Sequence, residues 1–344
     1  MKIAQIAPLY ESVPPSYYGG TERVVSYLTE ELVRQKHEVT LFASGDSVTS
    51  ARLVSCCQDS LRLAKTCVDP MPHFLLMLEL VCRMAPEFDL LHFHIDYLHF
   101  PLSRRHQYRQ LTTLHGRLDI PDLVPLYREF PEMPVISISD SQRAPLPWLN
   151  WQGTVHHGLP ADLLPFNPGG GDYLAFVGRI SPEKGVETAI AIARSSGIKL
   201  KIAAKVDKAD RDFYEAEIKP LIADGPLVEY VGEICEEEKK QFLGNALALI
   251  FPINWEEPFG LVQIESMACG TPVIAYPRGS VPEVVRDGVS GFLVHDMEEA
   301  VRAANRVGSL SRMRCRSYFE ERFLAARMAK DYVAIYRKLI ADNR

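Results

Sequence analysis

Short apolar runs alternate with helical patterns along nearly all of the 344 residues, and this alternation constrains the fold more than any other feature. Residues 22–35 carry apolar side chains at helical spacing, with Thr21 as the expected N-cap. Five runs in the first half predict buried strands: Ile3–Pro8, Glu38–Ala43, Leu90–His94, Leu111–His115 and Pro134–Ser139. Such alternation favours a parallel sheet that is covered by helices on both faces.

The alternation stops near residue 158 and then begins again. Residues 158–171 are rich in proline and glycine and suit an interdomain linker. We therefore expect two α/β domains, residues 1–160 and 161–321, followed by an amphipathic helix over Tyr318–Arg344. Five further strands are predicted after the linker: Tyr173–Gly178, Leu200–Ala204, Val228–Val231, Leu247–Pro252 and Pro272–Tyr276.

Composition excludes several classes of protein. A formal charge of −6 and a pI near 6.0 argue against a nucleic-acid binder, which needs a concentrated basic face. No run is long and apolar enough to predict a transmembrane helix, and the N-terminus has no signal-peptide core. Seven cysteines without a C-x-x-C pair suit a reducing compartment. We expect a cytoplasmic protein, with peripheral contact at the inner face of the plasma membrane left open.

The strongest motif places two glutamates eight positions apart, in Glu257-Pro-Phe-Gly-Leu-Val-Gln-Ile-Glu265. On a helix their carboxylates would lie about 12 Å apart along the axis. That distance is comparable to the span from hexose to ribose in a nucleotide sugar. Pro258 suits a first helical turn, and Gly260 lets a ligand approach the backbone closely.

A second motif supplies positive charge, in Phe176-Val-Gly-Arg-Ile-Ser-Pro-Glu-Lys-Gly185. It predicts a strand, a turn and a helix that starts near Lys184. Arg179 and Lys184 could stabilise a departing diphosphate without a metal ion.

Two weaker patterns lie in the first half of the chain. Gly19-Gly20 at a helix start is an anion-binding arrangement, although no G-x-G-x-x-G is present to indicate a nicotinamide dehydrogenase. The alternating residues His92, His94 and Asp96 would need further ligands to form a metal site, so we expect no metal.

Together these motifs resemble those of the retaining glycosyltransferases of family four (glycosyl transferases group 1), of the type that builds bacterial polysaccharides and envelope glycans. The resemblance covers essentially the whole chain. It implies the GT-B fold, in which two Rossmann-like doubly wound domains face a central cleft. Residues 1–160 would bind the acceptor, residues 161–321 would bind the donor, and a crossover helix at about 322–344 would pack back on the first domain.

The resemblance also assigns roles to residues. Glu257 would bind the hydroxyls of the donor sugar and Glu265 those of the ribose, while His115 would lie beneath the reacting sugar. Catalytic contacts are assigned to four residues: His115, Arg179, Lys184 and Glu257. Donor binding is assigned to a larger set: Gly19, Gly20, Arg179, Lys184, Val231, Glu233, Glu257, Phe259, Gly260, Leu261 and Glu265. Ser280, where the family usually has glycine, and Ala203-Ala204-Lys205 depart from the family pattern.

The expected reaction is transfer of a hexosyl unit to a hydroxyl of a glycan or lipid-linked saccharide, with same-face substitution and no cofactor or metal. UDP-glucose is the preferred donor, ahead of UDP-N-acetylglucosamine, GDP-mannose and ADP-glucose. Two alternatives remain. A GT-B sugar-nucleotide epimerase would act on the donor alone, and a non-catalytic protein would only bind it.

Overall fold

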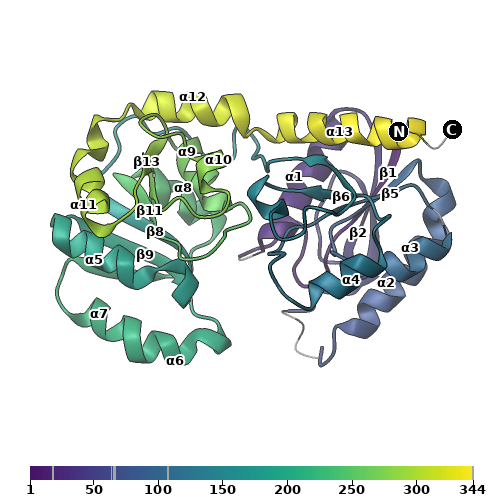
Figure 1. The fold of residues 1–344 in the computed structure, drawn as a ribbon, viewed down its shortest axis with the longest axis horizontal. Helices are drawn as coiled ribbons and strands as arrows, with labels where there is room; N and C mark the ends of the chain where they lie inside the picture. Colours follow the sequence, from purple (N-terminus) through teal and green to yellow (C-terminus); the bar gives the residue numbers. More distant parts are fainter. Residues whose placement is uncertain (18, 63, 65–66, 107, 343–344) are drawn as a thin grey trace. The chain divides into compact units, whose positions relative to one another are not determined.

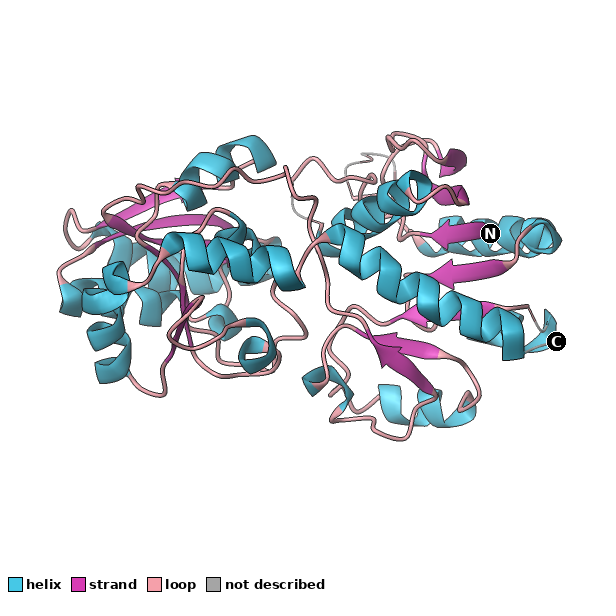
Figure 2. Cartoon of the chain, turned by 90° about the horizontal axis from the view of Figure 1, so that it is seen from above, coloured by secondary structure: helices cyan, strands magenta, loops and turns pink. Residues whose placement is uncertain are grey.

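The computed structural model describes residues 1–342, apart from residues 18, 63, 65, 66 and 107, and forms two compact units (Figure 1). The first unit comprises Met1–Pro160 with Ala325–Arg344, and the second comprises Ala161–Leu324. Each contains one parallel sheet with helices alongside its strands (Figure 2). The predicted fold class, two Rossmann-like α/β domains with a C-terminal crossover helix, is confirmed. The acceptor and donor roles of the units stay predictions.

The first unit has seven parallel strands in the order β3-β2-β1-β4-β5-β6-β7. They are β1 (Lys2–Ile6), β2 (Glu38–Ser44), β3 (Arg52–Cys57), β4 (Leu90–Phe93), β5 (Gln110–Thr113), β6 (Val135–Ser137) and β7 (Trp151–Thr154). Its helices are α1 (Gly20–Arg34), α2 (Met71–Met84), η1 (Ala85–Glu87), α3 (Phe100–His106), α4 (Leu123–Glu129), η2 (Ser141–Arg143) and α13 (Ala325–Asp342).

The second unit has six parallel strands in the order β10-β9-β8-β11-β12-β13. They are β8 (Tyr173–Arg179), β9 (Lys199–Lys205), β10 (Val228–Gly232), β11 (Ala248–Phe251), β12 (Val273–Ala275) and β13 (Gly291–Leu293). Its helices are η3 (Pro182–Lys184), α5 (Val186–Ser196), η4 (Lys208–Asp210), α6 (Arg211–Phe213), η5 (Tyr214–Ile218), α7 (Lys219–Ala223), α8 (Glu236–Gly244), α9 (Leu261–Ala268), α10 (Val281–Val284), α11 (Met297–Arg306), η6 (Val307–Ser309) and α12 (Arg312–Arg322).

In both sheets the strand order reverses once. The reversal lies between β1 and β4 in the first unit, and between β8 and β11 in the second. Open α/β sheets bind their ligands beyond the carboxyl ends of the strands at such a switch point.

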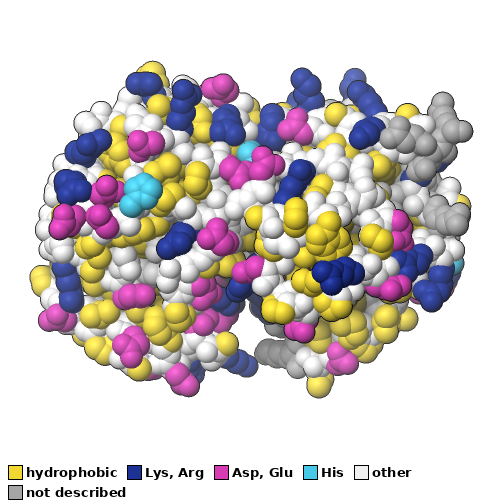
Figure 3. Space-filling view, viewed as in Figure 1, with side chains coloured by type: hydrophobic (Ala, Val, Ile, Leu, Met, Phe, Trp, Pro, Cys, Tyr) yellow, Lys and Arg dark blue, Asp and Glu magenta, His cyan; other side chains and the backbone are white. Residues whose placement is uncertain are grey.

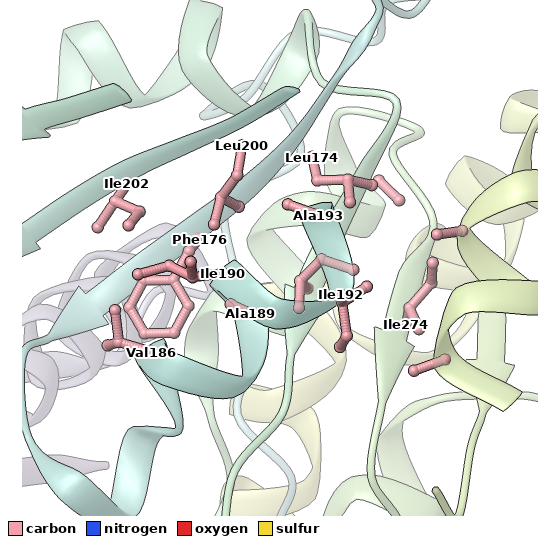
Figure 4. Packing of buried hydrophobic residues seen from close by; sticks show 14 of the residues in the cluster. Leu174, Phe176, Val186, Ala189, Ile190, Ile192, Ala193, Leu200, Ile202 and Ile274 are labelled. Carbon is pink, nitrogen blue, oxygen red and sulfur yellow. The ribbon is translucent and has the colours of Figure 1, made fainter. Parts of the chain in front are cut away.

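The core of the second unit shows how the apolar runs build this sheet. Each large apolar side chain (valine, leucine, isoleucine or phenylalanine) buried there contributes about 1.5–3 kcal/mol relative to an exposed one. Apolar side chains of β8 and β9 meet those of α5 (Figure 4): Leu174, Phe176, Leu200 and Ile202 from the strands, and Val186, Ala189, Ile190 and Ala193 from the helix. This packing fixes the position of the carboxyl end of β8, a central strand of the sheet.

Two helices begin two residues away from their predicted starts. Helix α1 begins at Gly20 with Gly19 as its N-cap residue, so Thr21 lies inside the helix instead of capping it. Helix α5 begins at Val186 instead of near Lys184, because Gly185 takes a left-handed conformation (φ 68°) after the turn η3. A Cβ at Gly185 would lie 2.2 Å from the carbonyl oxygen of Pro252, so glycine is required there.

The single C-terminal helix that we predicted is two helices, α12 and α13. The break follows from packing on two different cores. Phe323 ends α12 and its ring lies 6.0 Å from Tyr318 and 6.3 Å from Phe259 in the second unit. Ala325 then donates a hydrogen bond to the carbonyl of Leu159 in the first unit, where α13 packs against α1. Residues 343 and 344 of the predicted helix lie outside the described residues.

The helices and the distribution of surface charge agree with what the composition predicts. None of the described helices combines the length and the apolar character that crossing a bilayer requires. Acidic and basic side chains are interspersed on the face shown in Figure 3.

Candidate functional site

Several residues predicted to bind the donor lie at the carboxyl edge of the second unit's sheet. Arg179 is the last residue of β8, residues 257–260 follow β11, and Val231 is the penultimate residue of β10. Because these strands are parallel, their carboxyl ends meet at the same edge. The first two segments flank the switch point between β8 and β11, which is where this architecture binds ligands.

Lys184 and Glu257 form a direct ion pair at this edge. The Nζ atom of Lys184 lies 2.5 Å from Oε2 of Glu257, and the indole nitrogen of Trp255 donates to the same oxygen at 3.0 Å. The ammonium group also lies 4.8 Å from the centroid of the Trp255 ring. The side chains of Lys184 and Glu257 are 20% and 11% exposed, so solvent screens the pair only in part. Sequence reasoning missed Trp255, although it stands only two positions before Glu257.

The motif around Glu257 is a loop, which corrects the prediction that both glutamates lie on one helix. Helix α9 begins at Leu261, so Pro258 is not in a helical turn and only Glu265 is helical. The N-cap residue Gly260 has φ 75°, a left-handed conformation that favours glycine. The estimated separation along a helix axis therefore does not apply to this pair.

Residues of the loop before α10 hold this segment. Ser280 donates its backbone N–H to the carbonyl of Glu257 and its hydroxyl to the carbonyl of Phe259, each at 2.9 Å. At Gly279 (φ 56°) a Cβ would lie 2.4 Å from the backbone nitrogen of Glu257. Ser280, which stands where the family usually has glycine, thus holds the loop through two hydrogen bonds.

Glu265 is buried on α9, with 5% of its side chain exposed, and it pairs with Lys239 of α8. The Nζ atom of Lys239 lies 2.8 Å from Oε1 of Glu265. One oxygen of the carboxylate thus already has a charged partner. Lys239 was not predicted, because the pairing joins residues 26 positions apart on separate helices and leaves no local pattern.

Arg179 lies among carboxylates. Its guanidinium is 2.5 Å from Glu183, 3.5 Å from Asp210 and 3.9 Å from Asp207. Burial alone would raise the pKa of Glu183, but hydrogen bonds from the backbone and from Arg179 help to outweigh it and lower the pKa. An anionic ligand of Arg179 would therefore compete with acidic side chains. The sequence analysis did not identify this acidic cluster.

Other predicted residues lie near the end of a strand or the start of a helix. Val231 and Glu233 are exposed at the end of β10 and just beyond it. In the first unit, Gly19 precedes α1 and Gly20 is the first residue of that helix. A Cβ at Gly19 would lie 2.8 Å from Cβ of Pro15, so a larger residue would displace this loop.

His115 follows β5 in the first unit, and its half-buried side chain lies beside the buried histidines His94 and His157. Its Nε2 atom lies 2.9 Å from Nδ1 of His94, and its ring stacks on that of His157 at 5.5 Å. Burial lowers the pKa of His115 to about 3, so the ring is neutral at ordinary pH.

Asp96, next to these histidines, has φ 51°, and burial raises the pKa of its carboxyl to about 6. The nearby backbone of His115 partly offsets this rise in pKa.

Among the described residues, no three His, Cys, Asp or Glu side chains are arranged to hold a metal ion. His92 and His94 instead bond to neighbouring polar side chains. Independence from metal remains a prediction about the reaction.

Two family models match this chain. Residues 18–152 match Glycosyltransferase Family 4, and residues 165–322 match Glycosyl transferases group 1. The second match spans every residue assigned above to the second unit's edge.

Curated relatives match parts of the chain. The alpha-maltose-1-phosphate synthase of Mycolicibacterium smegmatis is 33% identical over 191 residues, which cover 49% of this chain and 48% of the relative. A D-inositol 3-phosphate glycosyltransferase of Acidothermus cellulolyticus is 29% identical over 255 residues, which cover 69% of this chain and 52% of the relative. The chain thus spans about half the length of these relatives.

Solved structures share the fold over nearly the whole chain. The sucrose-phosphate synthase of Thermosynechococcus elongatus has a TM-score of 0.78 at 22% identity, covering 99% of this chain and 100% of that one. Anabaena HepE, solved with UDP and glucose, has a TM-score of 0.75 at 17% identity, covering 98% and 100%. At such identities the likeness establishes the fold alone.

Proposed function

Because the chain belongs to the glycosyl transferases of group 1, we propose that it transfers a hexosyl unit from a nucleoside diphosphate sugar to a saccharide hydroxyl, with retention of configuration. The observation that carries the proposal is the Lys184–Glu257 pair at the switch point of a doubly wound sheet. A sugar diphosphate offers both members a partner, since its phosphates attract the ammonium and its hydroxyls can donate to the carboxylate.

The proposed donor is UDP-glucose, bound by the second unit. Lys184 and Arg179 would stabilise the charge that the diphosphate gains as the glycosidic bond breaks, without a metal. Glu257 would accept hydrogen bonds from sugar hydroxyls. Glu265 would accept them from the ribose, since Lys239 engages only one of its oxygens among the contacts described here. His115 would contact a hydroxyl of a sugar substrate.

In the proposed mechanism the acceptor hydroxyl attacks the face from which the diphosphate departs. The C1–O bond to the diphosphate breaks, the new glycosidic bond forms, and the leaving phosphate takes the proton of the acceptor. The protein would supply orientation and electrostatic stabilisation. A glycan or a lipid-linked saccharide is the proposed acceptor.

Glu265→Ala tests the assignment of the nucleotide site. Losing a charged acceptor for ribose hydroxyls should weaken UDP binding at least tenfold, or about 1.4 kcal/mol, in isothermal titration calorimetry. Glu265→Gln keeps the shape and should lose less. Glu298→Ala, which removes an exposed carboxylate from α11 of the same unit, is the matched control. Wild-type affinity in Glu265→Ala would contradict the assignment.

Two assays separate transfer from the alternatives. An isomeric sugar formed from the donor alone would indicate an epimerase. Sustained UDP release that depends on an acceptor would exclude a protein that only binds the donor. A thermal-shift panel of nucleotide sugars should identify the donor first, because ligands that bind the native state raise Tm.

A further inference from the structure

A chain of hydrogen bonds links helix α13 to His115 within the first unit. Tyr336 of α13 contacts His92 Nδ1 at 2.7 Å and the amide nitrogen of Gln5 at 3.3 Å. Gln5 Oε1 lies 2.7 Å from His94 Nε2, and His94 Nδ1 lies 2.9 Å from His115 Nε2. Five side chains from α13, β1 and the ends of β4 and β5 are thus connected in series.

The chain continues beyond His92, away from His115. His92 Nε2 lies 2.8 Å from the hydroxyl of Thr113, which lies 2.9 Å from the hydroxyl of Tyr332. Tyr332 therefore stands at the far end of the series, and its loss leaves every bond between His92 and His115 in place.

The Gln5 amide gives the series a direction. Its nitrogen can only donate, so the oxygen of Tyr336 accepts and the proton of Tyr336 goes to His92 Nδ1. Its oxygen can only accept, so His94 carries a proton on Nε2. Burial, together with the nearby histidines, lowers the pKa of His94 well below its ordinary value, so this ring is neutral and holds that proton alone.

The tautomer of His115 follows. His94 Nδ1 is unprotonated, so it accepts a hydrogen bond from His115 Nε2–H. A neutral histidine ring carries only one N–H, so His115 Nδ1 is unprotonated as well. His115 Nδ1 is buried and has no hydrogen-bond partner among the described side chains and backbone. The opposite direction would place an N–H there, and buried donors without partners are rarer than buried acceptors.

We propose that Gln5 and Tyr336 are positioning residues that hold His115 with its proton on Nε2, so that Nδ1 accepts a hydrogen bond from a hydroxyl of the substrate. The part that concerns the substrate rests on the proposed glycosyl transfer. A fixed tautomer matters because an unprotonated nitrogen accepts a hydrogen bond from a hydroxyl group, whereas an N–H at the same place would donate one to the hydroxyl oxygen. The C-terminal helix would thus contribute to substrate recognition without touching the substrate.

The tautomer can be measured by ¹⁵N NMR of protein labelled at histidine, with His115→Asn to assign the signal. In the wild-type protein, His115 Nδ1 should show the chemical shift of an unprotonated ring nitrogen. A protonated Nδ1 in the folded wild-type protein would overturn the inference, and this measurement needs no variant and no activity.

Tyr336→Phe removes the acceptor of the Gln5 amide nitrogen, so the amide group can turn over and reverse the hydrogen bonds of the series. The His115 Nδ1 signal should therefore move toward that of a protonated nitrogen. Tyr332→Phe is the matched control, since it also removes a tyrosine hydroxyl from α13 and should leave the signal unchanged. In the transfer reaction, Tyr336→Phe should lower kcat/KM for the donor at least fivefold at unchanged UDP affinity. An unshifted signal in folded Tyr336→Phe would contradict the positioning role.

Ligand titration identifies the hydroxyl and keeps the two proposals apart. A change in the Nδ1 signal with UDP-glucose but not with UDP would place the hydroxyl on the donor sugar. A change with free glucose alone would place it on a saccharide acceptor. No change with either would refute the accepting role of Nδ1. If the wild-type protein binds no nucleotide sugar while its Nδ1 is unprotonated, the glycosyltransferase function is contradicted and the tautomer assignment is not.

Discussion

Both units carry polar side chains at the carboxyl edge of a parallel sheet, but the two sets differ in charge. In the first unit, His92, His94 and His115 are joined to neutral neighbours by hydrogen bonds of 2.7–2.9 Å. In the second, Lys184 and Glu257 form an ion pair that is partly open to solvent. The same architecture therefore supports a neutral, buried network in one unit and a charged site in the other.

The difference shows what each site can do. Breaking a bond in the buried network leaves a polar group without a partner, at a cost of about 1–3 kcal/mol, so the network fixes geometry. A partly exposed ion pair can exchange one partner for a ligand, because solvent and ligand both compensate the lost contact. The first unit is thus suited to orientation, and the second to binding an anion.

The largest expected effect concerns Glu22, an ionisable group buried in the first unit. Burial raises the pKa of its carboxyl to about 7, against the stabilising influence of backbone hydrogen bonds, and Glu11 adds to the rise. The folded state then keeps a proton that the unfolded state has lost, so stability should fall as pH rises from about 4.5 to 7.

Glu22→Gln should remove this pH dependence. Relative to wild type, its free energy of unfolding at pH 8 should be higher by up to about 3 kcal/mol, and the gain should vanish near pH 4. Denaturant titrations at several pH values measure it, with Glu38→Gln, which changes an exposed carboxylate, as the control. Equal gains at pH 4 and pH 8 would show that the titration of Glu22 is not responsible.

The next effect tests the charged site of the second unit. Lys184→Ala and Arg179→Ala should each lower kcat at least tenfold, or about 1.4 kcal/mol, if their charges stabilise the leaving diphosphate. Lys219→Ala, which removes an exposed lysine paired with Glu215, should leave turnover unchanged. Wild-type turnover in a folded Arg179/Lys184 double variant would remove the diphosphate assignment.

The smallest effect concerns the acidic cluster around Arg179. Asp210→Asn removes one carboxylate that lies 3.5 Å from the guanidinium and so should strengthen UDP binding about twofold, or about 0.4 kcal/mol. Calorimetry at low salt should resolve the change, and Asp224→Asn, at an exposed carboxylate, is the reference. Weaker binding in Asp210→Asn would instead mean that Asp210 holds Arg179 in its binding position.

Much of the fold and part of the site follow from sequence alone. Parallel strands in the middle of a sheet are buried on both faces, so they appear as continuous apolar runs, and every strand predicted from such a run is present. Arg179, at the end of its strand, and Glu257, in the loop after its strand, could be placed at the carboxyl edge of the sheet because parallel strands end at the same edge. The strands missed are β3, β7 and β13, which all lie at sheet edges, where one neighbour is lacking and the apolar run is short or broken.

The chain therefore determines by itself the alternation that builds two doubly wound sheets and the sheet edge at which its motifs lie. Only the tertiary structure decides which charges pair there and how the histidines are linked. Lys239 meets Glu265, and Tyr336 meets His92 across 244 positions of sequence. Periodicity records which face of an element is buried, whereas these contacts depend on where distant segments meet after folding.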